Sequence, residues 1–149
     1  FRSGITTMIE PLQPVPIMVV MPASHRLAAR KIVSLKDLGG ERMILLSQHS
    51  YVRYQIDDAF ASAGVAPEVV VETPSSSIAC AMVAAGAGIT LVSQWTAEPF
   101  AGPDIVVRPV REAMSSRYAI IHPESQTPMS LARAFEAELR DCMKQGGFA

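Results

Sequence analysis

The chain has 149 residues, of which 49% are hydrophobic and 18% charged, so it can bury the core of one ordinary domain and is not an intrinsically disordered chain. Its 13 basic residues are scattered among 14 acidic residues for a formal net charge of −1, which excludes a basic face that would bind nucleic acid by itself. Its apolar runs are far shorter than the roughly 20 residues of a bilayer-spanning helix, and its two cysteines indicate a reducing, cytoplasmic compartment rather than a secreted disulfide scaffold.

Strand and helix patterns alternate from residue 17 onwards. The run 17–21 is continuously apolar and predicts a strand buried on both faces. A hydroxyl followed by a carboxylate three residues later predicts one helical turn at 34–38, and the apolar run 43–46 predicts a second strand. The apolar spacing over 52–63 predicts a helix that ends at Gly64 in a left-handed conformation.

The same unit then repeats. The run 69–72 predicts a strand, 78–85 an apolar helix and 88–92 a third strand. The order βαβαβ, with connections of this length, predicts parallel pairing of the three strands. The short apolar runs 105–107 and 118–121 are expected to return to this sheet.

The last helix shows the clearest helical pattern. Thr127 can cap it and Pro128 suits its first position. Its apolar residues form one stripe that needs a partner surface; they are Leu131, Ala134, Phe135, Leu139 and Cys142.

Three loops follow the predicted parallel strands, at 47–51, 73–76 and 93–95. All three contain hydroxyl or amide side chains and none contains a carboxylate. Ligands bind in open parallel sheets at this edge, where helix N-termini present free N–H groups to an anion. The sequence therefore predicts a site for a small anionic or zwitterionic ligand. The alternative is that these Ser and Thr residues only cap helices.

Other chemistry has little support. His49 lies beside two serines, but the chain has no nucleophile-elbow motif. His25 and His122 have no His or Cys at metal-ligand spacing, so we expect no metal. Cys80 and Cys142 lie on apolar helix faces and are expected to be packing thiols.

Two side chains near the loops allow more than one interpretation. Arg53 falls in the first turn of a helix, where a cation opposes the helix dipole, so it either marks a ligand carboxylate or is a solvated surface residue. Trp95 either stacks on a ligand or covers the edge of the sheet.

Five segments resemble one protein family in order and spacing. They read MPASHRLA at 21–28, VSLKDL at 33–38, FASAGVAP at 60–67, VAAGAGI at 83–89 and PMSLARAF at 128–135. Together they are similar to the effector-binding domain of LysR-type transcriptional regulators. The departures are Arg26 and Gln94, at positions where that family commonly has proline.

The resemblance implies an α/β fold like that of type 2 periplasmic binding proteins, with two lobes and a central, mostly parallel sheet flanked by helices. Residues 17–121 would form the second lobe, while 1–16 and 122–149 would be remnants of the first. Because the chain opens with Phe1, we expect a piece of a longer protein. The family's winged helix-turn-helix, which would contact DNA, has no counterpart in this chain.

The resemblance also implies the site and the function. The inducer-binding residues would be Ser47, Ser50, Tyr51, Val52, Thr73, Ser75 and Ser93. The expected protein is a cytoplasmic homo-oligomer that senses a metabolite, controls transcription, uses no cofactor and catalyses no reaction. The alternatives are a periplasmic solute-binding protein or an enzyme on the same scaffold.

Overall fold

The structure is a computed structural model that describes residues 7–123 and 129–144. The chain divides into two units. The sheet unit is Val15–Ser116, and the ribbon unit combines Phe1–Pro14 with Arg117–Ala149. No helix in the described ranges has the length and apolar character needed to cross a membrane.

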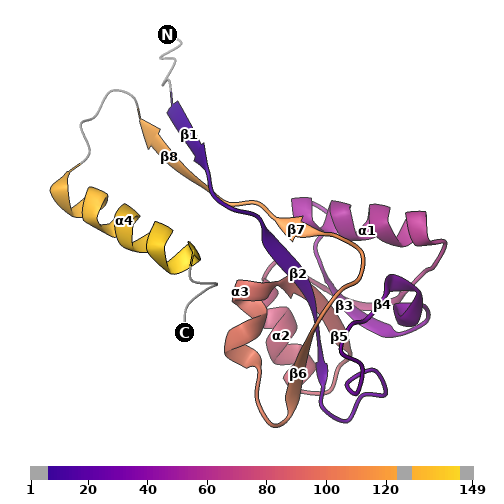
Figure 1. The fold of residues 1–149 in the computed structure, drawn as a ribbon. Helices are drawn as coiled ribbons and strands as arrows, with labels where there is room; N and C mark the ends of the chain where they lie inside the picture. Colours follow the sequence, from indigo (N-terminus) through magenta and orange to yellow (C-terminus); the bar gives the residue numbers. More distant parts are fainter. Residues whose placement is uncertain (1–6, 124–128, 145–149) are drawn as a thin grey trace. The chain divides into compact units, whose positions relative to one another are not determined.

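The sheet unit is built on one mixed sheet (Figure 1). Its main strands follow the order β4-β3-β5-β2-β6, and β7 pairs with β2 beside them. Because β3 pairs parallel with β4 and β5, while β2 pairs antiparallel with β5 and β6, only β2 among the main strands runs against the others. The strands are β2 (Val15–Pro22), β3 (Arg42–Leu46), β4 (Glu68–Thr73), β5 (Ile89–Ser93), β6 (Ile105–Pro109) and β7 (Ser115–Ser116).

Helices connect the parallel strands, as the sequence predicts. Helix α1 (Tyr51–Ala63) joins β3 to β4, and α2 (Ser76–Ala84) joins β4 to β5. Helix α1 ends at Gly64, whose φ of 67° is left-handed, the conformation expected there. Three short helices complete the unit: η1 (Leu35–Leu38), α3 (Gln94–Ala97) and η2 (Glu98–Phe100).

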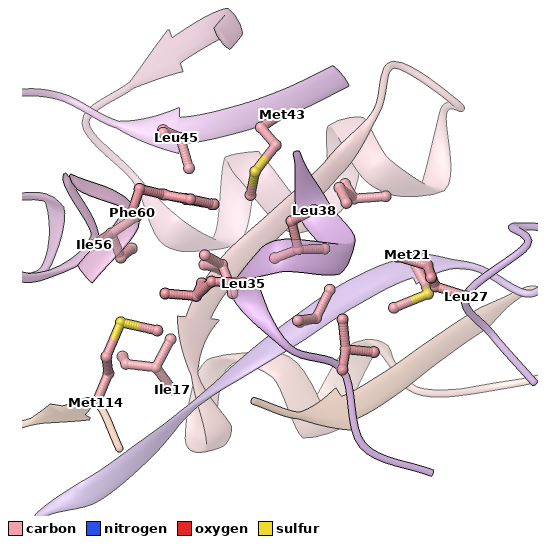
Figure 2. Packing of buried hydrophobic residues seen from close by; sticks show 14 of the residues in the cluster. Ile17, Met21, Leu27, Leu35, Leu38, Met43, Leu45, Ile56, Phe60 and Met114 are labelled. Atoms are coloured by element: carbon pink, nitrogen blue, oxygen red, sulfur yellow. The ribbon is translucent and has the colours of Figure 1, made fainter. Parts of the chain in front are cut away.

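Two hydrophobic clusters cover opposite faces of the sheet, since successive side chains of a strand point to opposite faces. In β3, Met43 and Leu45 belong to one cluster and Ile44 to the other. The first cluster takes in α1 and η1 through residues such as Phe60 and Leu38 (Figure 2). Helices α2 and α3 supply the second cluster, so the unit is a three-layer α/β structure.

The ribbon unit contains an antiparallel pair of strands, β1 (Thr7–Pro11) and β8 (Ala119–Pro123), and helix α4 (Ser130–Lys144). The guanidinium of Arg140 donates to both carboxylate oxygens of Glu10 at 3.0 and 2.7 Å. The polar side of α4 is thereby bound to β1.

One strand prediction is wrong. The run 105–107 does join the sheet, as part of β6, but 118–121 contributes to β8, which pairs with β1 instead. A short apolar run indicates a strand without indicating its partner, because pairing depends on distant segments. The predicted cap Thr127 and first helical residue Pro128 lie outside the described residues.

Candidate functional site

The three predicted loops meet at one edge of the sheet unit. Strand β3 lies between β4 and β5, and all three strands end at this edge. The N–H of Ser47 donates to the carbonyl oxygen of Thr73 at 3.0 Å. On the other side, Ile44 pairs with Thr90 in parallel register, so β3 and β5, which end at Leu46 and Ser93, end at the same edge.

The predicted site residues differ in exposure. Thr73 and Ser93 are buried, each 5% exposed, whereas Tyr51 is 57% exposed. The hydroxyl of Ser93 lies 3.2 Å from that of Thr96. The other members are half-buried: Ser47, Ser50, Val52 and Ser75. Among these, Val52 packs against the first hydrophobic cluster.

The serines that precede α1 and α2 behave differently. The hydroxyl of Ser75 accepts from the N–H of Ile78 at 3.4 Å and so caps α2. The side chain of Ser50 makes no capping bond to α1. Capping therefore accounts for Ser75 but not for Ser50, and the first N–H groups of α1 are left without this side-chain acceptor.

Arg53 is buried, and its guanidinium is paired within the protein. Its side chain is 7% exposed and donates to the carbonyl oxygen of Leu46 and to Glu72, both at 2.7 Å. It also donates to the two carboxylate oxygens of Asp57 at 2.8 and 2.9 Å. Burial opposes its charge, but the hydrogen bonds to Asp57 and Glu72, together with the negative charges of these two carboxylates, outweigh burial and raise the pKa of the guanidinium.

Only part of this arrangement could be found from the sequence. Asp57 follows Arg53 at the i,i+4 spacing of a helical ion pair. Nothing in the sequence indicates Glu72, which reaches Arg53 from the neighbouring strand.

Metal-ligating side chains do not gather at this edge in the part of the chain that the structure describes. In residues 7–123 and 129–144, no three His, Cys, Asp or Glu side chains are grouped to hold a metal ion. Cys80 is fully buried, and burial raises its pKa to about 11, as expected for a packing thiol. The loops offer hydroxyl groups and backbone N–H groups, which suit binding rather than proton transfer.

A cavity of about 270 Å³ lies at the opposite edge of the sheet, between the starts of β3 and β5. His25 lines it and is bonded at both ring nitrogens, because Nδ1 lies 3.3 Å from the N–H of Leu27 and Nε2 lies 3.1 Å from Glu41. Arg26 donates to the same carboxylate at 2.8 Å. These bonds tie the turn after β2 to β3, and we assign them a structural role.

Comparison with known proteins decides the family. Residues 8–144 match the model of the LysR substrate binding domain. The chain belongs to this family. The transcriptional activator protein LysR of Escherichia coli (strain K12) is 35% identical over 121 residues, which are 81% of this chain and 39% of that protein. The chain therefore spans well under half the length of this LysR-family relative.

Solved LysR-family structures share the fold. HinK, a LysR family transcriptional regulator from Pseudomonas aeruginosa, is 26% identical with a TM-score of 0.71, over 99% of this chain and 51% of that one. The effector binding domain of BenM with its effector benzoate gives 0.73 at 20% identity, over 100% of this chain and 69% of that one. The α/β fold of type 2 periplasmic binding proteins that the sequence predicts is confirmed.

Proposed function

We propose that this chain is the ligand-sensing domain of a LysR-type bacterial transcriptional regulator. The observation that carries the proposal is the meeting of three uncharged, hydroxyl-bearing loops at the carboxyl edge of β4, β3 and β5. In open α/β sheets this edge is where small ligands bind. Membership of the LysR substrate binding domain family favours this function over a periplasmic solute-binding protein.

The ligand is a small anionic or zwitterionic metabolite. Its carboxylate would accept from the first N–H groups of α1, which Ser50 leaves uncapped, and from nearby hydroxyls. The proposed contacts are those expected from the sequence: Ser47, Ser50, Tyr51, Val52, Thr73, Ser75 and Ser93. The carboxylate effector of BenM, benzoate, is of this chemical class.

Ligand binding would act on transcription through the arrangement of two lobes. The sheet unit, Val15–Ser116, would be one lobe, and the ribbon unit would belong to the other; the sequence prediction put these boundaries near residues 17 and 121. A ligand that binds better to one arrangement of the two lobes increases the population of that arrangement. The DNA-binding domains, which lie outside this chain, would then change position accordingly. The ligand leaves unchanged, no cofactor takes part, and the protein works as a cytoplasmic homo-oligomer, a dimer or tetramer.

The test is a ligand screen followed by one matched substitution. Small monocarboxylates, with benzoate first, and free amino acids are titrated against the full-length regulator by calorimetry and by fluorescence of Trp95, the only tryptophan of this chain. Binding that weakens about tenfold in Thr73→Val, which loses the hydroxyl and keeps the shape, supports the proposal. Chemical turnover of a bound compound, or equal binding by the variant, refutes it.

A further inference from the structure

We infer that Arg53 is a positioning residue that fixes residues 47–50, here called the effector loop, before any ligand arrives. The inference rests on the proposed function for its biological meaning, because the loop matters as part of a ligand site. It differs from both sequence interpretations of Arg53, which made it a ligand partner or a solvated side chain.

The side chain of Arg53 bridges the two ends of the effector loop. The guanidinium donates at 2.7 Å to the carbonyl oxygen of Leu46, the residue directly before the loop. Arg53 itself stands in the first turn of α1, directly after the loop. One side chain thus connects the residue where the loop begins with the helix where it ends.

A second connection reaches the neighbouring strand. Arg53 Nη1 lies 2.7 Å from Glu72 Oε1, and Glu72 directly precedes Thr73, whose carbonyl oxygen accepts from the N–H of Ser47. The loop is therefore tied to β4 by a backbone hydrogen bond at Ser47 and by an ion pair beside it, in which Arg53 is buried and Glu72 is partly exposed. Hydrogen bonds that involve charged groups are the stronger kind.

The unfavourable local position of Arg53 indicates that its role lies in the tertiary contacts it makes. A cation in the first turn of a helix opposes the helix dipole, and burial of the side chain, 7% exposed, adds a desolvation cost. Asp57 and Glu72 offset both costs, and these two carboxylates leave the guanidinium with no net positive charge to offer an anion. Positioning the loop is the role that remains. A loop ordered in advance loses less entropy when a ligand binds.

Substitutions of Asp57 and Glu72 can distinguish an effect on loop positioning from an effect on helix stability. Asp57 pairs with Arg53 within α1, at i,i+4, whereas Glu72 carries the connection to β4. Neutralising Glu72 therefore removes the tie between the loop and β4, and neutralising Asp57 removes a pair inside the helix. Their side chains are comparably exposed, 41% and 50%, so Asp57→Asn and Glu72→Gln form a matched pair.

Amide hydrogen exchange of the full-length protein tests the inference without a ligand. In Glu72→Gln and Arg53→Lys we expect about tenfold faster exchange at Ser47 and Ser50, whose N–H groups are hydrogen-bonded, with unchanged exchange in β2. Asp57→Asn should have a smaller effect on these amides than Glu72→Gln. Arg108→Lys is the control, since Arg108 also donates to backbone carbonyls, those of Arg30 and Ala28, but away from the loop.

Two outcomes would overturn the inference. One is unchanged exchange at Ser47 and Ser50 in Glu72→Gln. The other is acceleration spread equally over the whole sheet, as a purely structural ion pair would give. A titration with benzoate, followed by Trp95 fluorescence, then separates this inference from the proposed function. If no carboxylate binds the wild-type protein, the proposed function fails, while the exchange data still decide whether Arg53 positions the loop.

Discussion

The backbone N–H of Ser47 donates to the carbonyl oxygen of Thr73 at 3.0 Å, which joins the first residue after β3 directly to the last residue of β4. Two proposed ligand-binding residues from separate strand ends are thus neighbours before any ligand is present. The hydroxyl groups around this bond differ in what they already do for the fold, and that difference can be measured.

Ser50 and Ser75 should separate binding from stability. Ser75 caps α2, so Ser75→Ala should lower the free energy of unfolding by about 1 kcal/mol. Ser50 makes no capping bond, so Ser50→Ala should change stability by less than about 0.5 kcal/mol and weaken ligand binding. Denaturant unfolding and calorimetric titration of both variants check this. A large loss of stability in Ser50→Ala would contradict the assignment.

Gly88 should not tolerate a side chain. A Cβ at this position would lie 2.5 Å from the carbonyl oxygen of Arg42, so Gly88→Ala must push the start of β5 away from β3. We expect a loss of about 1–3 kcal/mol in unfolding free energy. Gly102→Ala is the control, since a Cβ there meets nothing within 4 Å, and it should be close to neutral in the same denaturation experiment.

Cys80 should be unreactive in the folded protein. Burial raises its pKa from 9.0 to about 11, so at pH 8 only about one thiol in a thousand is the reactive thiolate. In Cys142→Ser, where Cys80 is the remaining thiol of this chain, a chromogenic disulfide reagent should label Cys80 only as fast as the protein opens.

The raised pKa of Cys80 also makes the stability of the fold depend on pH. Because the folded pKa of Cys80 lies above the unfolded value, its contribution to stability is fully present below pH 9 and is lost as the pH rises towards about 11. Unfolding of Cys142→Ser and of Cys142→Ser with Cys80→Ala should therefore diverge in that window. Parallel curves would show that the thiol ionises normally.

Glu10 should titrate below its ordinary range. The hydrogen bond from Arg140, together with the charges of Arg140 and His122, lowers its pKa below 4.5. A lowered folded pKa means that the stabilising contribution is present above pH 4.5 and is lost as the pH falls through the lowered value. Carboxyl NMR titration should show this shift, and Arg140→Gln should remove most of it. Lys144→Gln removes a charge whose ion pair is with Asp141 and should have little effect.

Helix α4 should drive self-association. Leu131 and Phe135 are 76% and 66% exposed, and they share one apolar stripe. Leu131→Glu with Phe135→Glu should shift the protein to smaller species in light scattering at equal concentration. Ala137→Glu, which adds one negative charge off that stripe, should leave the association unchanged. An unaltered mass in the double variant would exclude this surface.

Local patterns in the sequence were sufficient for most of the sheet unit. The apolar spacing that ends at Gly64 locates α1, and the repeated strand and helix pattern gives the parallel order of β3, β4 and β5. These features depend on residues close together in the chain. The partner of the run 118–121 could not be predicted in this way, since β1 and β6 offer similar apolar strands.

The candidate loops were also found from the sequence, but the contacts of their side chains were not. A serine before a helix has the same pattern whether or not its hydroxyl caps, and only coordinates separate Ser50 from Ser75. Arg53 was recognised as unusual, yet its burial depends on Glu72, which is distant in sequence. Tertiary pairing of this kind leaves no trace in a local pattern.

The sheet unit begins and ends side by side, because Val15 at the start of β2 pairs with Ser116 at the end of β7. Its two ends can therefore be joined by a short linker, and new ends can be opened at an exposed turn to give a circular permutant. The same geometry allows the segment to be inserted as a cassette between two fluorescent proteins, which would give a genetically encoded sensor for whatever metabolite the loops bind.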